Sequence, residues 1–251
     1  MMHHPTLDKL QKLKLTGMLS ALQEQESVPD IRTLPFEERL GLMVDREMTE
    51  RENRRMQTRL RMAKLKQNSA MENIDFKTAR GLDRSVIMKL ADCEWVKEHM
   101  NVLITGATGL GKTYLACALA NKACREGYSS YYIRLTRLFQ ELDIGRADGR
   151  YAKMMRQFAK ADVLIMDEWG LSSLTDQHRR DLLEILDDRY KLRATIIASQ
   201  LPVSNWHEAI GDPTLADAIL DRIVHNAYKI NLSGKTMRKE MEKLTTDTTK
   251  P

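Results

Sequence analysis

Residues 101–113 read NVLITGATGLGKT, and the part from Gly106 to Thr113 matches the P-loop pattern G-x-x-x-x-G-K-[ST]. The apolar run before the motif predicts a buried parallel strand, and the residues after it are rich in helix formers. A strand, a glycine-rich loop and a helix form the context in which this motif binds nucleotide phosphates. The sequence therefore predicts a nucleotide site made of Gly106, Ala107, Thr108, Gly109, Leu110, Gly111, Lys112, Thr113 and Tyr114.

Each part of this motif has a chemical role in holding ATP and Mg²⁺. The glycines allow a tight turn that points backbone N–H groups at phosphate oxygens. We expect Lys112 to bring a positive charge to the β- and γ-phosphates, and the Thr113 hydroxyl to bind the magnesium ion. The helix that follows presents its positive N-terminal end to the same phosphates.

A pair of acids follows a second apolar strand. Residues 163–166 are all apolar, and Asp167 and Glu168 come directly after them. We expect Asp167 to hold the magnesium ion together with Thr113, and Glu168 to polarise the water that attacks the γ-phosphate. The adjacent Asp-Glu pair resembles the Walker B motif of AAA+ ATPases, so the sequence predicts ATP hydrolysis.

An AAA+ site also needs a polar sensor at the end of strand four and an arginine from a neighbouring subunit. Ser199 or Gln200 could be the sensor, although both could simply end a strand. Arg222 follows a helix and precedes the last strand, where this class presents its arginine finger. An intrachain salt bridge is the alternative for Arg222. If Arg222 is the finger, the active site lies between subunits.

The order of strands and helices predicts the fold. Apolar runs predict strands at residues 101–105, 129–135, 162–166, 194–198 and 228–232, with helices between them. This alternation predicts an α/β fold, a P-loop AAA+ core with a five-stranded parallel sheet. Residues 82–96 predict one helix ahead of the first strand. About 19 residues follow the last strand, too few for the helical lid domain of a full AAA+ protein.

We expect three regions along the chain. Residues 1–68 have helical spacing and no strand pattern, which predicts a small all-helical domain that binds a partner or DNA. Residues 69–240 form the ATPase domain, and residues 241–251 form a flexible tail. Ile74 and Phe76 lie just ahead of the core, where such a pair lines the nucleobase or belongs to the plain core.

Two basic segments are candidates for phosphate contacts to DNA. The first ends the helical domain and the second lies between strands two and three, where residues 136–161 are long enough for two extra helices. Initiator-type AAA+ proteins touch DNA with such an insert. The alternatives are a solvated helix face and a solvent-facing hairpin. The candidates are Arg51, Arg54, Arg55 and Arg59 in the first segment, and Arg146, Arg150, Lys153 and Arg156 in the second.

Composition sets further bounds. The chain has 251 residues, 42% of them hydrophobic and 30% charged, with a formal net charge of +5. This modest excess permits nucleic-acid binding without requiring it. No apolar run is long enough to span a membrane. The three cysteines lack CxxC spacing, which predicts reduced thiols and a cytoplasmic location.

Taken together, these motifs resemble the IstB family, helper ATPases of insertion sequences. The resemblance rests on the P-loop, on residues 166–170 (MDEWG), on residues 199–202 (SQLP), and above all on the Gly-Asp-Pro-Thr segment at residues 211–214. It implies a protein that binds duplex DNA with ATP, forms homo-oligomers on it, deforms it and presents it to a transposase encoded by a neighbouring gene.

The resemblance leaves two questions open. Relatives often place a second arginine that senses the γ-phosphate near the C-terminus, and Arg238 could fill this role. The family is also related to DnaC-type helicase loaders, so a helicase loader that prefers single strands is the alternative function. A nucleotide switch that does not hydrolyse ATP is a third hypothesis, which Glu168 argues against.

Overall fold

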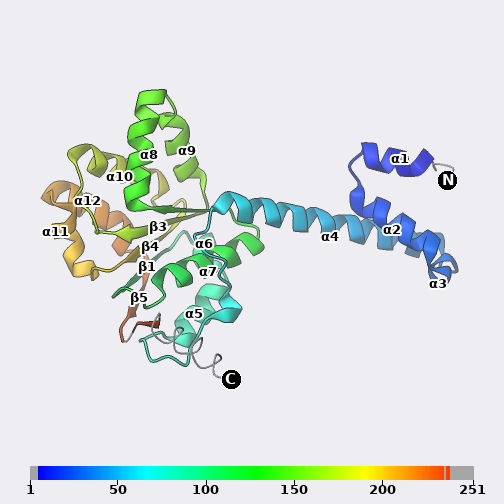
Figure 1. The fold of residues 1–251 in the computed structure, drawn as a ribbon, viewed down its shortest axis with the longest axis horizontal. Helices are drawn as coiled ribbons and strands as arrows, with labels where there is room; N and C mark the ends of the chain where they lie inside the picture. Colours follow the sequence, from blue (N-terminus) through cyan, green and yellow to red (C-terminus); the bar gives the residue numbers. More distant parts are fainter. Residues whose placement is uncertain (1–4, 235, 238–251) are drawn as a thin grey trace, which may run out of the picture. The chain divides into compact units, whose positions relative to one another are not determined.

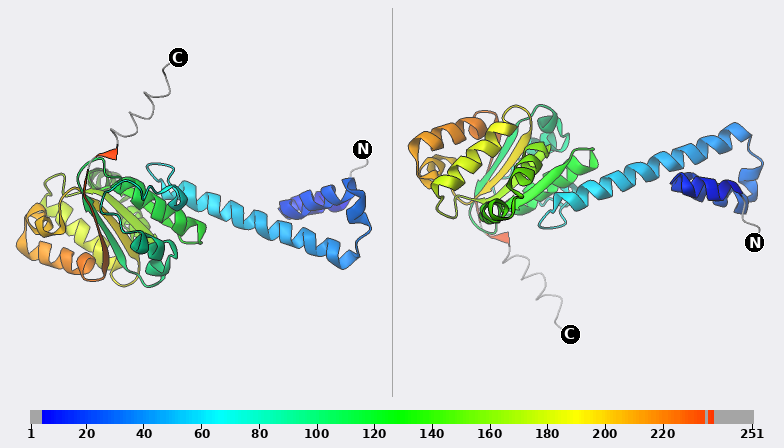
Figure 2. Two further views of the ribbon diagram at one scale, coloured as in Figure 1. Left: turned by 90° about the horizontal axis from the view of Figure 1, so that it is seen from below. Right: turned by 90° about the horizontal axis from the view of Figure 1, so that it is seen from above.

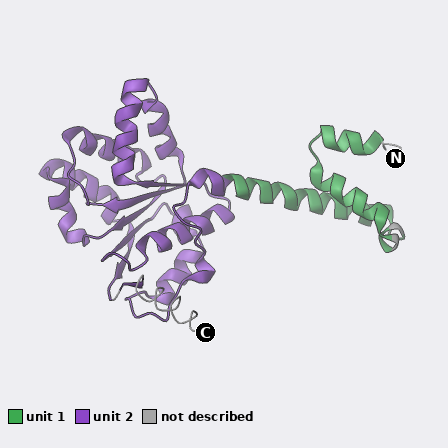
Figure 3. Cartoon of the chain, in the orientation of Figure 1, with its two compact units in different colours: residues 1–58 green, residues 59–251 purple. Residues whose placement is uncertain are grey.

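The computed structural model describes residues 5–234, 236 and 237. It divides into two compact units, one up to Thr58 and one from Arg59 onward (Figure 3). No helix among the described residues is long and apolar enough to cross a membrane.

Unit 1 is all-helical, as predicted. It contains α1 (Pro5–Lys12), α2 (Thr16–Ser27), α3 (Pro29–Arg32) and most of α4 (Phe36–Ala63). The buried Glu47 of α4 accepts hydrogen bonds from the backbone N–H groups of Gly17 (2.7 Å) and Met18 (3.2 Å). These N–H groups lie in the first turn of α2 and have no partner within their own helix, so Glu47 fastens α2 to α4.

Unit 2 is built on a parallel sheet of five strands in the order β2-β3-β4-β1-β5. The strands are β1 (Asn101–Gly106), β2 (Ser130–Arg134), β3 (Val163–Trp169), β4 (Ala194–Ser199) and β5 (Ala227–Leu232). This arrangement confirms the predicted α/β class. Because β4 pairs with both β1 and β3, its carboxyl end lies between the P-loop strand and the strand that carries the two acids.

Helices cover both faces of the sheet (Figures 1 and 2). On one face, α5 (Arg84–Ala91), α6 (Glu94–Lys97) and α7 (Lys112–Arg125) share a core with Ile104 and Ile196. On the other face, α8 (Leu135–Asp148), α9 (Tyr151–Lys160), α10 (Asp176–Arg189) and α12 (Pro213–Val224) pack with Leu103 and Ile197. Successive β1 residues thus face opposite cores, as a strand's two-residue period requires.

The prediction of a single helix at residues 82–96 was wrong. The chain forms α5 and α6 with a break at Cys93, whose backbone is left-handed (φ 59°). The two extra helices predicted between strands two and three are confirmed as α8 and α9. Gly149 ends α8 in a left-handed conformation (φ 80°), which glycine adopts without steric cost.

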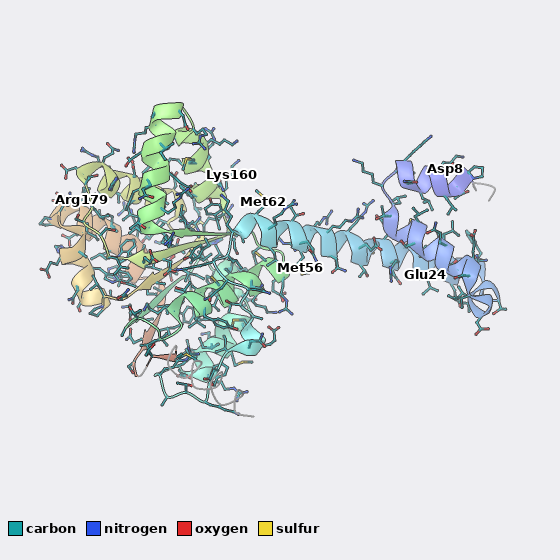
Figure 4. All side chains as sticks on the ribbon, in the orientation of Figure 1. Asp8, Glu24, Met56, Met62, Lys160 and Arg179 are labelled. Carbon is teal, nitrogen blue, oxygen red and sulfur yellow. The ribbon has the colours of Figure 1, made fainter. Side chains whose placement is uncertain are left out.

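The Gly-Asp-Pro-Thr segment makes the corner between α11 (Trp206–Ile210) and α12. Gly211 ends α11 with a φ of 77°, and the Asp212 carboxylate caps α12 by accepting from the N–H of Leu215 at 2.8 Å. Arg179 of α10, labelled in Figure 4, donates to the Ile210 carbonyl at 2.6 Å. The corner is therefore fixed to α10. Short 3₁₀ turns at Met71–Asn73 (η1) and Val203–Asn205 (η2) complete the described elements.

Candidate nucleotide-binding site

The P-loop joins the carboxyl end of β1 to the first residue of α7. Gly106, Gly109 and Gly111 have φ values of 142°, 85° and 88°, which residues with a side chain rarely adopt. A Cβ at Gly106 would lie 2.3 Å from the Leu232 carbonyl oxygen, so the loop also passes too close to β5 for a side chain. The glycines of the motif therefore meet a geometric need of this loop.

The Lys112 ammonium lies across the loop itself. Its Nζ donates to the carbonyl oxygens of Gly106 (2.7 Å) and Ala107 (2.8 Å), and the side chain is nearly buried. The charge is thus held among the loop residues that would surround the phosphates. Phosphate oxygens are stronger acceptors than peptide carbonyls because they are charged, so they can draw these hydrogen bonds away.

The structure brings together the two predicted magnesium ligands. The Thr113 hydroxyl donates to Asp167 Oδ2 at 2.8 Å. A hydroxyl and a carboxylate are hard oxygen donors of the kind that Mg²⁺ binds beside nucleotide phosphates, so this pair fits the ion. No sequence pattern indicated a third member, Tyr132 of β2, whose hydroxyl donates to the same oxygen at 2.8 Å. Burial raises the pKa of Tyr132, and the Asp167 charge raises it further.

Glu168 has an unusual backbone. Its φ is 63°, and the pairing of β3 with β4 is irregular between Met166 and Trp169. For a residue with a side chain, this conformation is strained, and such strain concentrates at functional sites. Glu168 Oε1 lies 3.8 Å from the cationic groups of both Lys66 and Arg134. The predicted catalytic carboxylate thus stands beside Asp167 and is half-exposed between two positive charges. No sequence pattern indicated these two charges.

The two sensor candidates differ in their surroundings. Ser199 is fully buried, and its hydroxyl donates to the Trp169 carbonyl (2.8 Å) and accepts from the Leu201 N–H (3.0 Å). These hydrogen bonds engage the Ser199 hydroxyl in holding β3 to β4. Gln200 is exposed directly after β4. Its amide is therefore the better placed of the two to reach a nucleotide.

Arg222 lies away from the P-loop of its own chain. Its backbone carbonyl accepts from Asn101 Nδ2 at 3.1 Å, and Asn101 begins β1 whereas the P-loop follows the end of β1. Six strand residues span about 17 Å. Within the chain, Arg222 Nε donates to Asp187 Oδ1 at 2.6 Å, the salt bridge considered as the alternative. Arg222 also lines a small pocket with His99, Lys191 and Arg193.

The predicted nucleobase residues lie near α7. Ile74 is buried in the core that contains Leu110 and Leu115 of the P-loop region. Phe76 is partly buried, with the Arg84 guanidinium 5.6 Å from its ring centre. The Tyr114 hydroxyl is 3.5 Å from the carbonyl oxygens of Ala70 and Asn73, so it faces the chain that leads to Ile74. Arg238 lies outside the described residues.

The candidate DNA-binding residues of unit 1 lie on α4. Arg51 Nε donates to Glu47 at 2.6 Å, and Arg54 is 3.6 Å from the same carboxylate. Arg55 is exposed. These three side chains remain largely open to solvent even where they pair, so they can still contact phosphates.

The candidates of unit 2 divide into engaged and exposed side chains. Arg59 donates to the Cys124 carbonyl at 2.8 Å. Arg146 pairs with the buried Asp181 and lies over the Tyr151 ring. The Arg59 and Arg146 side chains therefore help to hold their helices in place and are not free cations. Arg150 is exposed and pairs with Asp148, while Lys153 and Arg156 are exposed on α9.

Comparison with known proteins identifies relatives along nearly the whole chain. A family model described as IstB-like ATP binding protein matches residues 8–245. A Sinorhizobium fredii protein named as an insertion sequence ATP-binding protein is 50% identical over 243 residues, covering 97% of this chain and 99% of the relative. The protein named as the insertion sequence IS21 ATP-binding protein of Pseudomonas aeruginosa is 32% identical over 247 residues, covering 97% and 92%.

Two solved structures show a similar fold. The DnaC helicase loader superposes with a TM-score of 0.55 at 19% identity, over 66% of this chain and 97% of that one. DnaI gives a TM-score of 0.59 at 22% identity, over 70% and 94%. At these identities the likeness concerns the fold alone, and it agrees with the AAA+ class predicted from the sequence.

Proposed function

This chain belongs to the family of IstB-like ATP binding proteins, and from that membership we propose that it hydrolyses ATP to control its assembly on DNA during transposition. In this proposal, copies of the chain with bound ATP and Mg²⁺ oligomerise on duplex target DNA in the cytoplasm. They deform the duplex and present it to a transposase encoded by a neighbouring gene.

The observation that carries the hydrolysis step is the position of Glu168 beside the Asp167–Thr113 pair. Thr113 and Asp167 would hold Mg²⁺, which neutralises charge on the phosphates. Glu168 would accept a hydrogen bond from the attacking water and take up its proton. Gln200, at the end of the intervening strand, would orient the water or the γ-phosphate. Lys112 would exchange its loop carbonyls for phosphate oxygens when ATP binds.

The placement of Arg222 supports an active site between subunits. Because Arg222 lies at the opposite end of β1 from the P-loop, it cannot complete the site of its own chain. A neighbouring copy could receive it, and a guanidinium near the γ-phosphate stabilises the charge that develops during transfer. Assembly would then be required for rapid hydrolysis.

The exposed cations support contacts with the phosphate backbone. Arg55 on α4, and Lys153 and Arg156 on α9, are free enough to approach phosphates. Contacts of this kind carry little sequence information. Binding should therefore depend strongly on salt and weakly on base sequence. The helical unit 1 would hold DNA or the partner protein.

The experiment compares binding to a long duplex and to a single strand of equal length, with ATP and with ADP, at 50 and 200 mM salt. Cooperative binding to the duplex that requires ATP and weakens steeply with salt is the expected result. A preference for the single strand would favour the helicase-loader alternative. An absence of DNA affinity in every nucleotide state would refute the proposal.

A further inference from the structure

A buried arginine lies against the P-loop. Arg80, in the segment between η1 and α5, is 4% exposed. Its Nη1 donates to the Leu110 carbonyl at 2.9 Å, and its Nη2 donates to the Asp75 carbonyl at 2.8 Å. A Cβ placed on Gly111 would lie 2.6 Å from Arg80 Nη1. One guanidinium therefore connects the chain that follows Ile74 to the loop expected to hold phosphates.

The positive charge of Arg80 has no close counter-ion among the described residues. Its Nε is buried without a hydrogen-bond partner there. Burial lowers the pKa of Arg80, and the Asp75 charge opposes this only in part. The Asp75 carboxylate is turned away, since it accepts from Thr78 Oγ1 and from the Lys77 N–H. A buried cation without an acid beside it is costly unless something else compensates the charge.

Other positive charge is concentrated at the same place. The N-terminus of α7, which carries a partial positive charge, begins at Lys112 directly after Gly111. The Lys112 ammonium donates to the carbonyl oxygens of Gly106 and Ala107 in the same loop. An anion bound in the loop would compensate all three. The charge on the polyphosphate of ATP is therefore the kind that this arrangement favours.

The same guanidinium also connects to the last described residues. Met237 Sδ lies 3.0 Å from Arg80 Nη1, and the Met237 N–H donates to the Gly109 carbonyl at 3.0 Å. The Arg80 carbonyl accepts from the Ser233 N–H at 2.9 Å. Arg80 thus contacts the P-loop, the nearby Asp75, and two residues far away in the sequence, Ser233 and Met237.

We propose that Arg80 is a positioning residue for nucleotide binding. It holds the P-loop against the segment that leads from Ile74 and Phe76, and its uncompensated charge is balanced when a nucleoside di- or triphosphate occupies the loop. The inference rests on the proposed nucleotide site, and it concerns binding. The contacts of Arg80 are to the loop and to residues 75 and 237, so we expect its loss to affect binding and not the hydrolysis step.

Three variants of the full chain separate the contribution of the Arg80 charge from that of its hydrogen bonds. Arg80→Met keeps most of the length and removes the charge and all donors, whereas Arg80→Lys keeps the charge but offers one ammonium nitrogen in place of the two guanidinium nitrogens that donate to Leu110 and Asp75. Lys77→Met is the matched control, because Lys77 is an exposed cation on the same segment ahead of α5. The dissociation constants for ATP and ADP are measured by calorimetry, and ATP turnover is measured at saturating ATP.

The expected result is a Kd for ATP and for ADP raised about tenfold in Arg80→Met and about threefold in Arg80→Lys, with kcat within about twofold of the unchanged chain. Lys77→Met should bind as the unchanged chain does. If Arg80→Met does not fold, the nucleotide affinity of Arg80→Lys tests the inference. Unchanged affinity in a folded Arg80 variant, or a lower kcat with unchanged Kd, would overturn the inference. Lys112→Ala tests the nucleotide site separately, because unchanged ATP affinity in that variant would refute the site itself.

Discussion

The ion pair between Arg222 and Asp187 makes a quantitative prediction about assembly. If Arg222 must leave Asp187 to reach a neighbour's nucleotide, then Asp187→Asn should make assembly easier. The pair is close, 2.6 Å from Nε to Oδ1, but the Arg222 side chain is 26% exposed and that of Asp187 is 60% exposed. Solvent screening at such exposure limits the pair to about 0.5–1 kcal/mol. That energy corresponds to about a two- to fivefold change in an equilibrium constant.

The assay is steady-state ATP hydrolysis on a long duplex as a function of protein concentration. Asp187→Asn should lower the protein concentration at half-maximal turnover by about two- to fivefold and leave the maximal rate nearly unchanged. Arg222→Ala should abolish the stimulated rate, because an arginine finger contributes about a thousandfold or more.

A matched control removes another acid from α10. Asp176 pairs with Arg179 at 2.6 Å and is 80% exposed, and it does not touch Arg222. Asp176→Asn should leave the half-maximal concentration unchanged. The reasoning would be refuted if Asp187→Asn, with an unchanged melting temperature, required the same or a higher protein concentration than the unchanged chain.

Three further changes have expected outcomes. Glu168→Gln should reduce ATP turnover at least a hundredfold while ATP binding and ATP-dependent DNA binding persist, as turnover and filter-binding assays can check. Tyr132→Phe removes one of two hydroxyls that donate to Asp167 Oδ2, so the Mg²⁺ concentration at half-maximal turnover should shift by about three- to tenfold. Arg189→Met leaves the buried carbonyls of Phe158 and Ala161 without their donor. Chemical denaturation should therefore show a free energy of unfolding that is lower by about 3 kcal/mol or more.

Local patterns predicted the centre of the site and most of the fold. The P-loop, the Asp167–Glu168 pair and the five strands each follow from a few consecutive residues whose chemistry requires that order. The extra helices α8 and α9 followed from the length between strands. The resemblance to the IstB family, which rested on motifs far apart in the sequence, is confirmed by the family match.

Contacts between distant residues could not be predicted in this way. Arg80 lies 30 residues before Leu110 and has no motif of its own, and Tyr132 lies 35 residues before Asp167. Arg146 was grouped with exposed cations, yet its pairing with Asp181 depends on how α8 packs on α10. The left-handed backbone at Cys93 and Glu168 is also set by tertiary packing, because neither residue type favours it.

The central claim is that ATP drives several copies of the chain to assemble on duplex DNA. The most direct measurement is the mass of the complex on a short duplex of defined length, by analytical ultracentrifugation, with ATP and then with ADP. Glu168→Gln should hold the ATP state during the run. The account predicts a complex of several copies with ATP that disperses with ADP. A single copy per duplex in both nucleotide states would contradict it.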